Sequence, residues 1–168
     1  TAIGNMALVN LEGSGMIGVP GTADRLFAAL KNAGVSVTLI SQASSEHSIC
    51  VAVPQDVAER ARQVVSTAFA DELASGQIQS VDVTEAQSIV AVVGDGMAGS
   101  PGIAGRFFGT LGRAGINIRA IAQGSSERNI SAVVDSSEST RALRAAHSGF
   151  YLSSKTISIG LIGSGNVG

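Results

Sequence analysis

Two glycine-rich segments and two glutamines are the residues of this sequence best suited to bind a small ligand. Residues 13–21 (GSGMIGVPG) and 94–102 (GDGMAGSPG) each lie between an apolar run and a helical pattern. A glycine-rich backbone can approach a ligand closely, and the amides at a helix N-terminus attract an anion such as a carboxylate. Gln42 and Gln123 are expected across from these loops, at the ends of strands, where their amides can donate and accept hydrogen bonds. The alternatives are a flexible link for each loop and a polar residue at a hairpin mouth for each glutamine.

The two glycine segments belong to an internal repeat. Gln123 follows Gln42 by 81 positions, and about twenty of the forty-eight positions in residues 6–53 are identical to their counterparts in residues 87–134. The same offset, without a gap, aligns three residues of each loop: Met16, Gly18 and Pro20 with Met97, Gly99 and Pro101. The match indicates a tandem duplication. Because a flexible link does not require matched residues, the duplication favours ligand binding by both loops.

The pattern G-x-G-x-x-G, which can mark a dinucleotide site, occurs at residues 13–18, 94–99 and 163–168. A true fingerprint opens directly into its helix and is followed about 20 residues later by an acid. The first two copies lack these features, so we do not expect them to bind a nucleotide. The third copy, which contains Gly163, Gly165 and Gly168, follows the apolar run 156–162, as in a parallel nucleotide-binding sheet. It predicts NAD(P) binding only in a longer protein that supplies the helix, and none by this chain.

No group of residues in the sequence resembles a catalytic or metal site. His47 aligns with Arg128 in the other copy and His147 stands alone, so neither histidine has neighbours at metal-ligand spacing. Glu46 and Glu127 are matched acids, but these acids and the two serines before each of them are more typical of residues that shape a turn than of ligand-binding residues. We therefore expect a sensor and not an enzyme, with no cofactor of its own.

Composition excludes several partners. The chain has 11 basic and 13 acidic residues, a net charge of −2, no Trp and no basic cluster, so nucleic acid is not an expected partner. No apolar run approaches the roughly 18 residues of a membrane span, and a single cysteine, Cys50, suits a buried structural thiol in a reducing compartment. The sequence predicts a cytoplasmic protein that does not contact a membrane.

Each repeat follows the order βαββαβ, which predicts an α+β protein made of two ferredoxin-like domains packed side by side. The elements expected in the first copy are strand 6–12, a helix from about residue 20 to 33, strands 35–40 and 48–53, helix 56–73 and strand 78–83. The second copy has strand 89–93, helix 102–114, hairpin 117–134 and helix 138–147, and its sixth element is in doubt. The predicted units are residues 1–84, residues 85–150, and a segment 151–168 that links to the start of a nucleotide-binding strand and loop.

Several segments resemble the tandem ACT domains that lie between the catalytic halves of bifunctional aspartate kinase–homoserine dehydrogenases. They are NMALVNLEGSGMIGVPG, LISQASSEHSI, VVGDGMAGSPGIAGRFF and INIRAIAQGSSERNISAVV. The tail TISIGLIGSGNVG is similar to the first strand and nucleotide loop of the dehydrogenase half. The resemblance implies a full-length protein that phosphorylates aspartate with ATP and Mg²⁺ and reduces aspartate semialdehyde to homoserine with NAD(P)H. It also implies feedback inhibition by L-threonine bound at the ACT domains.

The same resemblance implies particular effector contacts. Gln42 and Gln123 would contact threonine. The loop residues Met16, Gly18, Met97 and Gly99 are expected at the same sites because the duplication matches them. An Asn that opens the second strand of the second domain would also reach the effector. That residue is Asn117, whereas the first copy has Ser36, so the equivalence of the two sites stays open.

The resemblance also places the first domain as an insertion within the second, whose missing strand precedes the first repeat. Because only residues 1–5 precede it here, the second sheet is expected to be incomplete, or to borrow residues 156–162 or a strand of a neighbouring chain. Apolar strand edges predict a homo-oligomer, at least a dimer. The alternatives to a threonine sensor are a lysine sensor, in which Glu46 and Glu127 meet the ammonium, and a structural dimerisation unit without a ligand.

Overall fold

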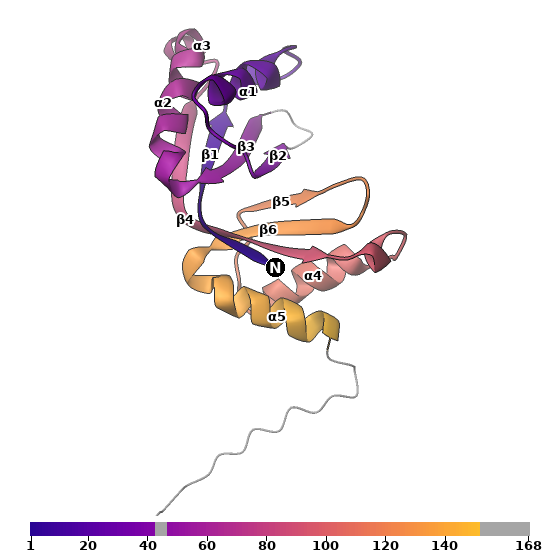
Figure 1. The fold of residues 1–168 in the computed structure, drawn as a ribbon. Coiled ribbons are helices and arrows are strands. Elements are labelled where there is room, and N and C mark those ends of the chain that lie inside the picture. The colour runs from indigo at the N-terminus through magenta and orange to yellow at the C-terminus, as the bar shows by residue number, and fades with distance from the viewer. Residues whose placement is uncertain (43–46, 152–168) are drawn as a thin grey trace, which may run out of the picture.

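Strand pairing joins the two repeats into one antiparallel sheet of six strands in the order β2-β3-β1-β4-β6-β5 (Figure 1). The structure is a computed structural model and describes residues 1–42 and 47–151. The glycine motif at 163–168, the apolar run 156–162 and Glu46 lie outside the described residues. Two βαββα repeats that share a mixed α/β architecture confirm the fold class predicted from the sequence.

The first repeat contains these elements: β1 (Ala2–Glu12), η1 (Ser14–Met16), α1 (Thr22–Asn32), β2 (Leu39–Gln42), β3 (Ser48–Pro54), η2 (Gln55–Val57), α2 (Ala58–Ala68) and α3 (Ala70–Ser75). The second repeat contains β4 (Ser80–Val93), which begins in the first, and η3 (Asp95–Met97), α4 (Ile103–Arg113), β5 (Ala120–Gln123), β6 (Asn129–Asp135), η4 (Ser136–Glu138) and α5 (Ser139–Tyr151).

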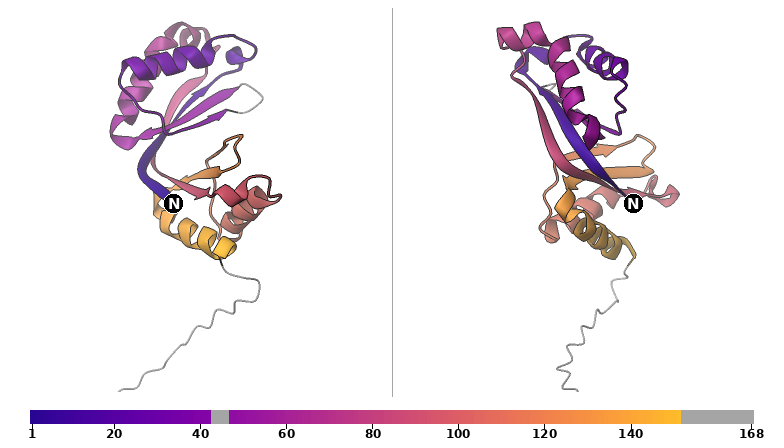
Figure 2. Two further views of the ribbon diagram at one scale, coloured as in Figure 1. Left: turned by 45° about the vertical axis from the view of Figure 1, so that its right-hand side comes forward. Right: turned by 60° about the vertical axis from the view of Figure 1, so that its left-hand side comes forward.

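Strands β1 and β4 run through both halves of the molecule (Figures 1 and 2). The sequence predicted two separate strands, 78–83 and 89–93, but β4 is continuous from Ser80 to Val93. Its polar middle stays in the sheet because it pairs with β1, and the pairing changes register there. Ala86 and Asn5 take positive φ angles of 55° and 54° beside this irregularity, so the sheet bends where one repeat passes into the other.

The start of β1 supplies part of the missing strand of the second repeat. Ala2 pairs with Val90 and Ile3 with Ile89, and the Ala91 N–H donates to the Thr1 carbonyl at 2.9 Å. The second sheet therefore receives a short fourth strand from the N-terminal residues of the same chain.

The side chains of the shared sheet alternate between three hydrophobic clusters. One face of each half is covered by helices, with Leu26 and Phe69 in the first core and Phe107 and Leu111 in the second. The helix-free faces of the two halves are turned toward each other (Figure 2). A third cluster fills the space between them: Met6, Leu8, Leu39, Ala52, Ile89, Ala120 and Val133. Residues 6–9 of β1 and 87–90 of β4 are therefore buried on both faces, which fixes the two halves relative to each other.

The helix boundaries follow local backbone chemistry. Helix α1 begins at Thr22 instead of Pro20 because Gly21 takes the left-handed conformation, with φ 88°. The helix ends as predicted at Gly34, where the Val35 N–H donates to the Leu30 carbonyl in a C-terminal cap. The predicted helix 56–73 is broken at Phe69, whose φ of −115° separates α2 from α3.

Cys50 lies on β3 among the residues packed between the two halves. Burial raises the pKa of its thiol to about 11, so little reactive thiolate forms near neutral pH. The geometry agrees with a structural thiol.

Candidate functional site

The first glycine loop and Gln42 line one pocket of about 340 Å³. The loop connects β1 to α1, and Gln42 is the last residue of β2. The lining residues are Met16, Gly18, Val19, Pro20, Gly21, Thr22, Ala23, Gln42 and Ile49. Three residues predicted from the sequence, Met16, Gly18 and Gln42, therefore meet at one site.

The second repeat forms the equivalent pocket, of about 350 Å³. Its lining residues are Met97, Gly99, Ser100, Pro101, Gly102, Ile103, Ala104, Gln123, Glu127 and Ile130. Met97, Gly99 and Gln123 were predicted from the sequence, and they lie together here as their counterparts do in the first repeat.

Left-handed glycines and a buried methionine give each loop its shape. Gly18 and Gly99 have φ angles of 66° and 69°, a conformation that residues with a side chain rarely adopt. The methionine two residues earlier is buried in the core of its own repeat, with Met16 5% and Met97 8% exposed. The methionine thus anchors each loop to the hydrophobic core, while the glycine backbone of the loop lines the pocket.

The start of a helix supplies hydrogen-bond donors to each pocket. The first backbone hydrogen bond of α1 runs from the Arg25 N–H to the Gly21 carbonyl, and that of α4 runs from the Arg106 N–H to the Gly102 carbonyl. The preceding amides of a first helical turn have no acceptor within the helix, and the helix dipole adds partial positive charge there. Each pocket therefore combines an anion-attracting end with a glutamine amide.

The two pockets differ in the residues beside the shared ones. The first contains Val19 and Thr22, where the second contains Ser100 and Ile103. The Thr22 hydroxyl donates to the Val19 carbonyl at 3.2 Å, and the Ser100 hydroxyl donates to the Gly96 carbonyl at 2.9 Å. A hydroxyl thus lies at a different point in each pocket, so the two sites are not chemically identical.

Glu127 also lines the second pocket; the sequence assigned it to the turn and, in the lysine alternative, to the ammonium of the ligand. One carboxylate oxygen, Oε2, accepts the Gly99 N–H at 2.6 Å, and the side chain lines the second pocket. Its own N–H donates to the Gly124 carbonyl at 3.0 Å, so the residue also shapes the turn between β5 and β6, as predicted. The signal in the sequence was that Glu46 and Glu127 are acids matched between the repeats.

Asn117 and Ser36 line neither loop pocket. Both are exposed and lie in the extended segments that follow the C-terminal caps of α4 and α1. Their predicted contact with the effector therefore stays a prediction.

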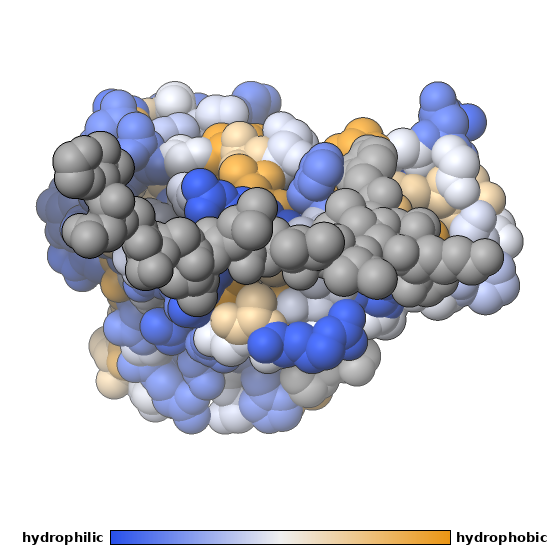
Figure 3. Space-filling view, turned by 90° about the horizontal axis from the view of Figure 1, so that it is seen from below, coloured by the Kyte–Doolittle hydropathy of each residue, from blue (hydrophilic) through white to orange (hydrophobic). Residues whose placement is uncertain are grey.

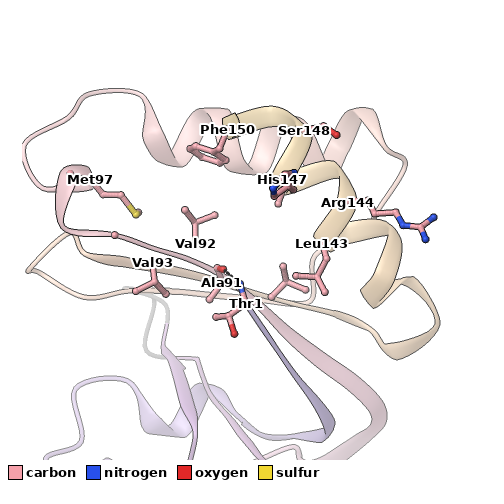
Figure 4. A pocket seen from close by; sticks show the side chains of 14 residues that line it. Thr1, Ala91, Val92, Val93, Met97, Leu143, Arg144, His147, Ser148 and Phe150 are labelled. Atoms are coloured by element: carbon pink, nitrogen blue, oxygen red, sulfur yellow. Dashed lines mark hydrogen bonds between the residues drawn. The ribbon is translucent and has the colours of Figure 1, made fainter. Parts of the chain in front are cut away.

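A further cavity, of about 910 Å³, is an apolar groove between the end of β4 and helix α5. Its walls include Val92, Leu143 and Phe150, with His147 on the helix side (Figure 4). At the equivalent place in the first repeat, Ile78 is 2% exposed and the Gln77 carbonyl accepts the Gly15 N–H at 2.9 Å. Among the described residues, the second repeat has no segment equivalent to residues 77 and 78. This difference accounts for the groove, and no ligand is needed to explain it.

Residues that could hold a metal do not gather anywhere in the ranges 1–42 and 47–151. No helix within the same ranges is both long enough and apolar enough to cross a membrane.

Comparisons with known proteins agree with the repeat. A family model described as ACT domain matches residues 9–69 and 90–150, the same 81-residue offset. The chain is 50% identical over 166 residues to "Bifunctional aspartokinase/homoserine dehydrogenase 1, chloroplastic" of Arabidopsis thaliana, a match that covers 99% of this chain and 18% of that protein. It is 47% identical over 168 residues to the bifunctional aspartokinase/homoserine dehydrogenase of Haemophilus influenzae, covering 100% of this chain and 21% of that one.

Among solved structures, the chain resembles the ligand-free regulatory subunit of aspartate kinase from Thermus thermophilus. The two are 28% identical with a TM-score of 0.74, and the match covers 90% of this chain and 96% of the other. These findings confirm the resemblance seen in the repeated segments. The chain spans only about a fifth of the length of its curated relatives.

Proposed function

The chain belongs to the ACT-domain family, as a tandem pair of ACT domains, and we propose that it is the effector-binding regulatory region of a bifunctional aspartokinase/homoserine dehydrogenase. The observation that carries this proposal is the pair of equivalent pockets, each of which unites a glycine loop, a helix N-terminus and a glutamine. In the full-length protein, segments outside this chain would use ATP with Mg²⁺ and NAD(P)H, and the region described here would control them.

The proposed effector is L-threonine. Pockets of about 340 and 350 Å³ lie at the small end of the usual range for ligand sites, which suits a single amino acid. The carboxylate of the effector would bind the amides of the glycine loop and helix start. The amide of Gln42 or Gln123 would pair with the ammonium or hydroxyl group, because it can both accept and donate.

The long strands offer a route from the pockets to the rest of the molecule. The first loop directly follows the end of β1 and the second follows the end of β4, and each of these strands begins in the other half. A ligand that binds one arrangement of loop and strand more tightly than another shifts the equilibrium between them. Threonine would thereby favour one arrangement of the two repeats, with feedback inhibition as the result.

Lysine is the second candidate effector, and it rests on Glu127. The carboxylate of this residue lines the second pocket and could pair with a side-chain ammonium. A structural dimerisation unit without a ligand is the candidate from another class.

Calorimetric titration of the chain with L-threonine, and with L-lysine in parallel, separates these functions. We expect saturable threonine binding in the micromolar to millimolar range, since a ligand of about eight heavy atoms gains at most about 1.5 kcal/mol per atom and usually much less. Tighter binding of lysine than of threonine would identify lysine as the effector. If the folded chain binds neither amino acid at about 10 mM, a concentration at the upper end of the expected range, the structural unit becomes the better interpretation.

We also expect the chain to form at least a dimer in solution. The edge strands β2 and β5 carry the equivalent residues Ile40 and Ile121, which are 49% and 43% exposed. Edge strands with exposed apolar side chains pair readily with other chains. On the face seen in Figure 3, hydrophilic residues are interspersed with hydrophobic areas outside the grey atoms.

Light scattering measures this association directly. The wild-type chain should have at least twice the monomer mass, and the double substitution Ile40→Lys, Ile121→Lys should lower the mass by placing charge on both edges. A wild-type monomer at high concentration would refute the prediction. An oligomer unchanged in the double variant would place the interface elsewhere.

A further inference from the structure

The anion-attracting end of the second pocket already holds a carboxylate, that of Glu127. Its Oε2 atom accepts the Gly99 N–H at 2.6 Å, a short distance typical of a hydrogen bond to a charged acceptor. Gly99 belongs to the loop whose amides are proposed to bind the carboxylate of the effector. Glu127 thus uses a donor that the effector would need.

The hairpin turn that carries Glu127 is tied to the same loop at two further points. The Gly94 N–H donates to the Arg128 carbonyl at 3.0 Å, and the Arg128 guanidinium lies 3.4 Å from a carboxylate oxygen of Asp95. Glu127 itself has a φ of 56°, which is unfavourable for a residue with a side chain. Its side chain is directed at the loop from a backbone position that the surrounding contacts must maintain.

We propose that, in the absence of an effector, the carboxylate of Glu127 takes the place of the effector carboxylate in the second pocket, and that the effector enters by displacing it. The inference rests on the proposed function of this pocket. Two carboxylates cannot both accept the Gly99 N–H at hydrogen-bond distance, because their like charges repel each other. The amino acid therefore replaces the carboxylate of Glu127 with its own, so the Gly99 N–H donates to a carboxylate before and after the exchange.

This exchange sets the class of ligand and links binding to a movement. A ligand carboxylate replaces the charged acceptor at Gly99, whereas an amide carbonyl can form only a weaker, neutral hydrogen bond there, so the amide of threonine should bind the second pocket more weakly than threonine itself. When Glu127 leaves, the turn loses one of its ties to the loop. The next residues of that turn enter β6, where Asn129 pairs with Val93 at the end of β4. Displacement of Glu127 therefore acts on the strand pair that joins the pocket to the shared sheet.

The test uses two variants of the 168-residue chain and follows the Gly99 amide by NMR. Glu127→Gln keeps the length of the side chain and removes its charge, and Glu127→Gly removes the side chain at a φ that glycine accepts readily. Glu85→Gln is the control, because Glu85 is exposed and its loss changes the net charge equally. In the absence of ligand, both Glu127 variants should shift the Gly99 resonance and the control should not.

Acetate and threonine then probe the vacated donor. Acetate should shift the Gly99 amide in Glu127→Gly but not in the wild type, where the donor is occupied. Threonine should bind the second pocket of Glu127→Gly about tenfold more tightly than that of the wild type, because no charged hydrogen bond has to be broken first.

Two contrary results overturn the inference, and a third result separates it from the proposed function. Weaker threonine binding by Glu127→Gly would mean that Glu127 contacts the ligand, for example by pairing with the ammonium group of threonine. A Gly99 resonance that does not move in either ligand-free variant would mean that the contact is absent in solution. If threonine binds no variant but acetate still shifts Gly99 in Glu127→Gly, the occupancy by Glu127 stands and the proposed effector function fails.

Discussion

Replacing Gln42 or Gln123 by alanine is expected to weaken threonine binding at the affected pocket by roughly 5- to 150-fold. Each glutamine lines its pocket opposite the glycine loop, so its loss leaves polar groups of an enclosed ligand without a partner. Both side chains are exposed in the free protein, and the free energy of unfolding should change by no more than about 0.5 kcal/mol. Calorimetry and urea denaturation measure the two quantities on the same variants.

Gln79→Ala is the matched control, since Gln79 is also exposed but lines neither pocket. In the full-length enzyme, the Gln42→Ala, Gln123→Ala double variant should lose threonine inhibition and keep its uninhibited turnover, because an effector acts only through differential binding to two states. A glutamine that only supports its hairpin would give the opposite pattern, with lower stability and unchanged threonine affinity.

The second large effect concerns a pair of equivalent glycines. Gly13→Ala should reduce the free energy of unfolding by at least about 1–3 kcal/mol, the usual cost of overpacking. A Cβ atom at Gly13 would lie 2.5 Å from both the Gln77 carbonyl oxygen and the Ile78 Cα, which are backbone atoms that cannot rotate away. The φ of Gly13 is 172°, an extended value open to any residue, so the expected loss is purely steric.

Gly94→Ala provides the comparison for this prediction. A Cβ atom at Gly94 would meet only the flexible Met97 side chain, at 3.9 Å, and we expect a change within about 0.5 kcal/mol. Urea denaturation of both variants measures the difference. Equal losses would show that residues 77 and 78 do not cover the first loop as described, and would remove the explanation for the apolar groove in the second repeat.

The core of each site was predictable because the duplication acts as an internal comparison. Matched residues at a constant offset identified both glycine loops with Gln42 and Gln123, and the structure places each loop beside its glutamine. The helix cap at Gly34 was also predictable, since it depends on one local residue type with φ 67°.

Features that depend on distant contacts were not predictable from local patterns. The polar middle of β4 interrupts the apolar pattern, yet pairing with β1 keeps the strand continuous. The contact between Glu127 and Gly99 joins residues 28 positions apart, and no periodicity in the sequence signals it. Asn117 was assigned to the effector site through the resemblance alone. It is exposed, and any contact with the effector would depend on how domains or chains assemble around it.

The most direct test of threonine binding at the two equivalent pockets is an NMR titration of the folded chain with L-threonine. We predict saturable shifts of the amides of residues 18, 19, 21 and 22 and of residues 99, 100, 102 and 103, with the response of the first loop lost in Gln42→Ala and that of the second lost in Gln123→Ala. No shift in either loop at about 10 mM threonine, at the upper end of the expected affinity range, would contradict the assignment, as would saturable shifts confined to the groove between β4 and α5.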